Sequence, residues 1–86
     1  MWEISLSEKS KKIISKLDNQ TQSKILNFLN KENLKKSPKL FGKALTSNLK
    51  GLWRYRVGDY RIICDLQEKE LVVLVIEINH RSKIYK

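Results

Sequence analysis

The chain has 86 residues, with 18 Lys and Arg against 9 Asp and Glu, which gives a formal net charge of +9. A domain usually holds about 100–200 residues, which excludes a second domain, and a hydrophobic content of 41% favours a folded core over disorder. The longest apolar run, residues 71–76, is far shorter than the roughly 20 residues that span a membrane, and we expect no signal peptide. A single cysteine forms no internal disulfide or metal cluster and suits the reducing cytoplasm. We therefore expect one cytoplasmic domain, 1–86, with a polyanionic partner and no membrane contact.

The first half of the chain predicts one strand and two helices. Apolar and polar residues alternate over 1–6, which indicates a half-buried strand. Ser7 is a good helix N-cap, so a short helix should begin after it and end near Leu17. After a turn, a second helix should fray near Asn33, and the two should form a helical hairpin. Residues 40–51 read as a lysine-rich connecting loop with two glycines.

The last third of the chain predicts three strands. Residues 52–57 alternate in polarity, Gly58 and Asp59 are a two-residue hairpin signal, and residues 60–66 form the second strand. Residues 71–78 are an almost continuous β-branched run, which is typical of a strand covered on both faces. The predicted order is β-α-α-β-β-β, an α+β domain with an N-terminal helical hairpin packed on a small, mainly antiparallel sheet.

The predicted hairpin brings three arginines together. With Gly58 and Asp59 in the turn, Arg56 lies directly opposite Arg61, and the period of two along a strand puts Arg54 on the same face. Like charges in direct opposition destabilise a hairpin, so this placement favours a functional role over a structural one. Three arginines that converge on a rigid sheet face predict a phosphate-binding surface.

The other face of the sheet should form the core. In the hairpin, alternation points these side chains toward the core: Trp53, Tyr55, Val57, Tyr60, Ile62, Cys64 and Leu66. The third strand should do the same with Val72, Leu74, Ile76 and Ile78. Glu77, Asn79 and Arg81 should then lie beside the arginines, with His80 pointing the other way and Tyr85 in the tail. Because the hairpin aromatics are expected to face the core, no aromatic site for single-stranded nucleic acid is predicted.

Two segments resemble the RelE/ParE superfamily of bacterial toxin–antitoxin proteins: G-K-A-L-T-S-N-L-K-G-L-W-R-Y-R-V-G-D-Y-R-I-I (42–63) and V-I-E-I-N-H-R-S-K-I-Y (75–85). The second is close to the H-R-x-x-x-Y ending of that superfamily, and the predicted element order is also the same. The resemblance implies a single RelE-like toxin domain over 1–86. Within the superfamily the chain looks like the RelE-like mRNA interferase branch of type II systems. These are endoribonucleases that enter the ribosomal A site, cut the mRNA there and inhibit translation.

The resemblance also implies a catalytic set. RelE-like toxins use basic residues on the central strands together with an arginine and a tyrosine near the C-terminus. Carried over residue by residue, this set is Arg54, Arg56, Arg61, Arg81 and Tyr85. The best-known members have lysine at the first two positions, so this chain departs from them there.

The chemistry implied by the resemblance uses no metal and no other cofactor. The ribose 2′-OH attacks the adjacent phosphorus, which leaves a 2′,3′-cyclic phosphate and a 5′-OH. Arginine is a poor base but a good clamp for phosphorane oxygens, so Tyr85 or His80 remains for proton transfer. The family favours the tyrosine, whose phenolate the flanking arginines would stabilise. Histidine is the residue type best suited to proton transfer near neutral pH, but His80 alternates away from the arginines.

Lysines supply most of the remaining positive charge. Residues 1–50 hold eleven lysines, no arginine and four acidic residues. We expect sequence-independent contacts with RNA, mainly ribosomal RNA, from Lys35, Lys36, Lys39, Lys43, Lys50 and His80. The resemblance implies the ribosome and mRNA as partners, and a cognate acidic antitoxin protein through which the pair would reach operator DNA.

Two other functions stay open at this point. A ParE-like toxin inhibits DNA gyrase and lacks the nuclease residues, and the H-R-S-K-I-Y ending (80–85) argues against it. A non-catalytic basic RNA-binding module would use the same arginines only to hold phosphate.

Overall fold

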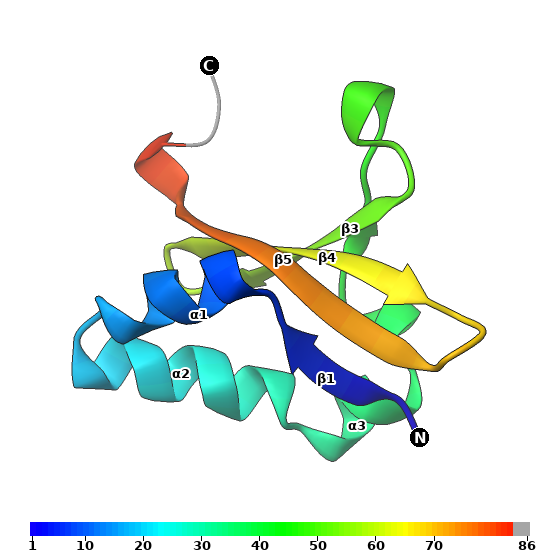
Figure 1. Cartoon of the computed structure of the whole chain (residues 1–86), viewed down its shortest axis with the longest axis horizontal. Helices are drawn as coiled ribbons and strands as arrows, with labels where there is room; N and C mark the ends of the chain where they lie inside the picture. The colour runs from blue at the N-terminus through cyan, green and yellow to red at the C-terminus, as the bar shows by residue number, and fades with distance from the viewer. Residues whose placement is uncertain (84–86) are drawn as a thin grey trace.

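Residues 1–83, which the computed structural model describes, form a five-stranded sheet with helices against one of its faces (Figure 1). The N-terminal elements are β1 (Glu3–Leu6), α1 (Glu8–Ser15), α2 (Asn19–Leu29) and α3 (Glu32–Lys36). The strands that follow are β2 (Lys43–Ala44), β3 (Leu52–Val57), β4 (Tyr60–Gln67) and β5 (Val72–His80). Three short 3-10 turns complete the described chain: η1 (Pro38–Leu40), η2 (Ser47–Leu49) and η3 (Arg81–Lys83). Within this part of the chain no helix has the length and apolar character to cross a membrane.

The strand order in the sheet is β1-β5-β4-β3-β2. β1 pairs with β5 in parallel, and the other neighbours are antiparallel. This confirms the predicted α+β fold, with an N-terminal helical hairpin on a mainly antiparallel sheet. The long crossover from β1 through the helices returns the chain to the sheet and leaves the face away from the helices uncovered (Figure 1).

Two elements differ from the prediction. The second helix, α2, ends before Asn33. Asn30 caps its C-terminal end, because both the backbone N–H and the side-chain amide of Asn30 donate hydrogen bonds to the Leu26 carbonyl. Lys31 is then extended, and the short α3 begins at Glu32. The expected loop over 40–51 contains β2, a two-residue edge strand paired with β3.

The core lies between the helices and the sheet. α2 and α3 contribute Ile25, Leu29 and Leu34, each at most 1% exposed, and burial of such side chains stabilises a fold by roughly 1.5–3 kcal/mol each. Tyr55 of β3 is fully buried and packs on Phe28 with ring centroids 5.6 Å apart. Its hydroxyl donates to the Pro38 carbonyl at 2.8 Å, and burial raises the pKa of this phenol, so the hydroxyl stays a neutral donor. The chain after α3 is thereby attached to the centre of the sheet.

A bulge interrupts the pairing of β4 with β5. Ile63 lies opposite Glu77, but the next residue of β4, Cys64, lies opposite Val75. Ile76 is therefore an extra residue in β5, and an extra residue shifts the side-chain alternation by one.

This shift overturns part of the predicted third strand. Val73 and Val75 are the fully buried residues before the bulge, whereas Ile78 is buried after it. The prediction that Val72 and Leu74 face the core is therefore wrong, and both are only half-buried. The expectation for Ile78, Glu77 and Asn79 does hold, because these residues follow the bulge.

Two serines at the start of α1 hold the bulged segment. Ser7 caps α1 as predicted: its Oγ accepts a hydrogen bond from the Ser10 N–H at 3.1 Å. Its hydroxyl also donates to the Ile76 carbonyl at 3.2 Å, and the buried Ser10 hydroxyl donates to the Val75 carbonyl at 3.0 Å. The N-terminal end of α1 is thus fixed to β5 at the bulge.

Candidate nucleic-acid interface

The turn between β3 and β4 determines which arginines meet. Of the two turn residues only Gly58 has a positive φ, +58°, which fits the type II′ hairpin with glycine at the first central position. Val57 pairs with Tyr60 and Arg56 with Arg61, so the predicted register is confirmed.

The side of β3 and β4 away from the helices carries Arg54, Arg56 and Arg61, and we call it the arginine face. Arg56 is exposed and lies directly across from Arg61, which is half-buried, as is Arg54. On the outer side of β3, Lys43 of the edge strand lies opposite Arg54. Opposed residues on neighbouring strands share a face, so four cations lie together across three strands.

Two acidic residues of this face, Glu77 and Asp65, form no ion pair with Lys43, Arg54 or Arg56 within residues 1–83. Glu77 points to the same side but forms an ion pair with Lys9 at 3.4 Å, and Asp65 accepts a hydrogen bond from Gln67 at 3.4 Å. Within residues 1–83, the side chains of Lys43, Arg54 and Arg56 form no ion pair with an acid. These three side chains therefore present positive charge of the kind that binds phosphate.

Arg81 lies at the hairpin end of the arginine face. Its backbone N–H donates to the Asp59 carbonyl at 2.7 Å, and its Nε lies 3.7 Å from Asp59 Oδ1. Both side chains are about two-thirds exposed, and an exposed ion pair contributes only about 0–1 kcal/mol, so a phosphate could displace the carboxylate. The last member of the expected catalytic set, Tyr85, lies outside the described residues.

His80 lies away from the arginine face. It pairs with Tyr60 across the strands and meets that ring edge-on, with centroids 5.2 Å apart. Its Nδ1 is 2.8 Å from Ser82 Oγ. The alternation that the sequence predicted is confirmed, and a role for His80 in RNA binding stays a prediction.

The remaining lysines that we expect to contact RNA lie on several elements. Lys35 and Lys36 belong to α3, and the Lys35 carbonyl accepts from the Trp2 N–H near the start of β1. Lys39 forms an ion pair with Glu68, and Lys50 is exposed after η2. Only Lys43, among the five lysines expected to bind RNA, is brought next to an arginine.

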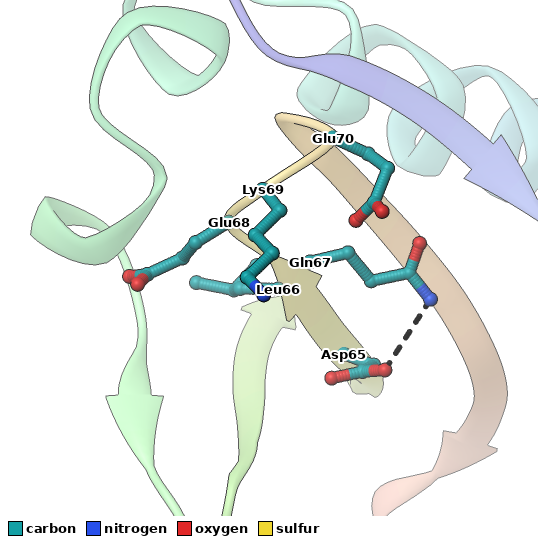
Figure 2. Close-up of a pocket in the computed structure, with 6 residues that line it drawn as sticks. All are labelled: Asp65, Leu66, Gln67, Glu68, Lys69 and Glu70. Carbon is teal, nitrogen blue, oxygen red and sulfur yellow. Dashed lines mark hydrogen bonds between the residues drawn. The ribbon is translucent and has the colours of Figure 1, made fainter.

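A hollow with a volume of about 740 Å³ lies at the β4–β5 turn (Figure 2). Six residues line it, among them three carboxylates and one ammonium group: Asp65, Leu66, Gln67, Glu68, Lys69 and Glu70. Excess negative charge repels a polyanion, so this hollow is no part of a nucleic-acid interface. No group of three His, Cys, Asp or Glu residues within 1–83 could hold a metal ion.

Sequence reasoning missed a second hollow, which adjoins the arginines. It has a volume of about 190 Å³ and is lined by Phe41, Gly42, Lys43, Arg54 and Arg56. Phe41 is 44% exposed, so an aromatic ring does stand beside the cations, contrary to the expectation from the hairpin aromatics alone. No sequence signal could have found it, because β2 has only two residues and Phe41 lies outside it.

A family model described as "ParE toxin of type II toxin-antitoxin system, parDE" matches residues 4–85. Toxin RelG of Mycobacterium tuberculosis is 30% identical over 54 residues, which cover 63% of this chain. The match spans 62% of RelG's own length.

Solved structures share the fold. The toxin–antitoxin complex RelBE2 from Mycobacterium tuberculosis matches with a TM-score of 0.85 at 21% identity, over 93% of this chain and 98% of that one. The YoeB/ParE toxin from Agrobacterium tumefaciens matches with a TM-score of 0.71 at 17% identity, over 91% and 96%.

Proposed function

We propose that this chain, which belongs to the RelE/ParE superfamily of type II toxin–antitoxin toxins, is a ribosome-dependent endoribonuclease that cuts mRNA in the A site. The observation that carries the proposal is the arginine face. Arg56 and Arg61 lie directly opposite each other, and Arg54 adjoins them on the same open surface. Opposed cations cost stability in the free protein, and a phosphate bound between them would remove that cost.

The arginines suit the transition state of RNA cleavage. As the 2′-oxygen forms its bond to phosphorus and the bond to the 5′-oxygen breaks, negative charge builds on the non-bridging oxygens. Guanidinium groups stay protonated and donate several N–H groups to such oxygens, so Arg54, Arg56 and Arg61 would stabilise that charge. The products would be a 2′,3′-cyclic phosphate and a 5′-OH end.

The same reaction needs a group that takes the proton of the 2′-OH and one that returns a proton to the 5′-oxygen. His80 packs against Tyr60 on the opposite side of the sheet, which speaks against it for both tasks. We therefore assign proton transfer to Tyr85, with Arg81 as a further phosphate contact at the edge of the face.

Partners complete the proposal. The arginine face is open and has few groups that could read bases, so the ribosome would position the mRNA. Lys35, Lys36, Lys39 and Lys50 would bind ribosomal RNA through its phosphates. A relative of the same fold is a toxin–antitoxin complex, which supports an acidic antitoxin as cognate partner, with operator DNA bound by the pair through that antitoxin.

Primer extension on mRNA tests the proposal. The purified protein is incubated with free mRNA and with ribosomes programmed with the same mRNA and an empty A site. We expect cuts in the A-site codon on ribosomes, with 5′-OH ends, and little cutting of free mRNA. Efficient cutting of free mRNA, or no cutting on ribosomes, contradicts the proposal.

Inhibition of DNA gyrase is the second candidate, because the matching family model is described as a ParE toxin. A supercoiling assay with purified gyrase separates the two. Inhibition of supercoiling without mRNA cleavage would place the chain in that branch. Binding of ribosomes with neither activity would indicate a non-catalytic RNA-binding module.

A further inference from the structure

The hollow beside the arginine face is built by the close approach of β2 to β3. A Cβ placed on Gly42 would lie 2.7 Å from the Arg54 carbonyl oxygen and 2.9 Å from the Tyr55 ring, so only glycine fits there without a shift. Gly42 thus faces the core side. Phe41 and Lys43, the residues on either side of Gly42, line the hollow together with Arg54 and Arg56.

The hollow is strongly cationic. Lys43, Arg54 and Arg56 line it, and none of them has an ion-pair partner in the described part of the chain. Lys43 lies two strand spacings, or about 10 Å, from the strand that carries Arg61. The hollow is therefore next to the proposed position of the scissile phosphate and separate from it.

Phe41 gives the hollow an aromatic wall. It is 44% exposed, and it belongs neither to the buried core nor to the hydrophobic residues packed against that core. An exposed ring beside cations is the combination with which proteins hold a nucleotide of a single strand: the base stacks on the ring and the phosphate meets the charge.

We propose that this hollow is a nucleotide subsite, in which the base of a nucleotide flanking the scissile phosphate stacks on Phe41 while its own phosphate binds Lys43. This assignment rests on the proposed function for the identity of the RNA as mRNA. Stacking accepts every base, so the subsite positions the strand and selects no codon. Arg54 and Arg56 border both the subsite and the reactive phosphate.

A binding experiment away from the ribosome tests the subsite. Short single-stranded oligonucleotides are made fully 2′-O-methylated, which blocks cleavage, with one 2-aminopurine at a different position in each. Stacking quenches the fluorescence of 2-aminopurine. We expect quenching on binding for one position along the strand in the wild-type protein.

The variants are chosen so that each tests one contact. Phe41→Ala should abolish the quenching and weaken binding about 10-fold, as loss of one stacked base does. Phe41→Trp should keep both. Leu40→Ala is the matched control, because Leu40 is the neighbouring apolar residue and is 81% exposed, and it should change neither. Lys43→Gln should keep the quenching but lower the dependence of binding on salt by about one phosphate contact.

The subsite is refuted if the oligonucleotides do not bind, or if Phe41→Ala binds and quenches as the wild type does. It is also refuted if Leu40→Ala loses as much as Phe41→Ala, because the patch would then be a general apolar surface, as a protein partner needs. These results are independent of catalysis. A protein that quenches through Phe41 but never cuts mRNA on ribosomes would disprove the proposed activity and leave the nucleotide subsite in place.

Discussion

Replacement of Arg56 by glutamine should raise the stability of the free protein and lower its cleavage activity. Arg56 and Arg61 are directly opposed on β3 and β4, so their Cβ atoms are roughly 5 Å apart. If the guanidinium groups splay to about 8 Å, Coulomb's law gives a repulsion of about 0.5 kcal/mol in water and about 2 kcal/mol at an effective dielectric constant of 20. Arg56 is exposed, which puts the value near the lower figure.

Urea denaturation of Arg56→Gln measures the stability. We expect the free energy of unfolding to rise by about 0.2–1 kcal/mol, the range measured for cross-strand pairs. The rise should shrink in 1 M salt, where the screening length is about 3 Å rather than the roughly 10 Å of 0.1 M salt. Single-turnover cleavage on saturated ribosomes should fall about 100-fold or more, as on loss of one donor to a developing oxyanion.

Lys69→Gln is the control, because it removes the same charge at the β4–β5 turn, at the far end of the hairpin. It should leave the cleavage rate unchanged. The reasoning is refuted if Arg56→Gln destabilises the protein by more than 1 kcal/mol, since the arginine would then support the fold. A wild-type cleavage rate in this variant would refute it as well.

Gly42→Ala should lower the free energy of unfolding by about 1–3 kcal/mol in urea denaturation, because the added methyl group would meet the Arg54 carbonyl and the Tyr55 ring at 2.7–2.9 Å; unchanged stability would contradict the close packing of β2 on β3. Burial raises the pKa of the Cys64 thiol to about 12, so the native protein at pH 8 should react with a disulfide reagent only as fast as it opens, and rapid labelling would contradict this burial. The unfolded thiol ionises near pH 8.5, so its contribution to stability is complete below that pH and is lost as pH rises toward 12; Cys64→Ala should remove this part of the alkaline slope. Tyr85→Phe keeps the ring, and it should slow cleavage on ribosomes while leaving binding and thermal stability unchanged; a wild-type rate would exclude the hydroxyl from proton transfer.

The arginine face could be predicted from the sequence because it depends on local geometry alone. A two-residue turn that begins with Gly58 leaves one register for the flanking strands, and that register opposes Arg56 and Arg61. The alternation of side chains along a strand then assigns each remaining residue of the hairpin to one face of the sheet. The N-cap at Ser7 was also predicted correctly, because it depends on a hydrogen bond between the Ser7 hydroxyl and an N–H only three residues away.

The third strand shows where local pattern fails. Residues 71–76 are all apolar, so no polar residue marks which side faces the core, and the inference had to assume regular alternation. The bulge at Ile76 breaks that alternation. The bulge is stabilised by hydrogen bonds from Ser7 and Ser10, which are more than 60 residues away in the chain. The sequence of the strand and its neighbouring residues therefore does not reveal the bulge.

The nucleotide subsite was decided by tertiary structure in the same way. A two-residue strand such as β2 is too short to carry a periodic signal, and Phe41 could face either side of a loop. Its place beside Arg54 and Arg56 depends on the folded chain, in which Gly42 packs against Tyr55 and the Tyr55 hydroxyl donates a hydrogen bond to the Pro38 carbonyl. The sequence by itself determined which arginines oppose each other, because one turn and one period suffice for that. The sequence did not determine that Lys43 and Phe41 lie beside these arginines. That arrangement depends on packing between segments distant in the chain, because a residue without a periodic pattern around it is positioned only by its tertiary contacts.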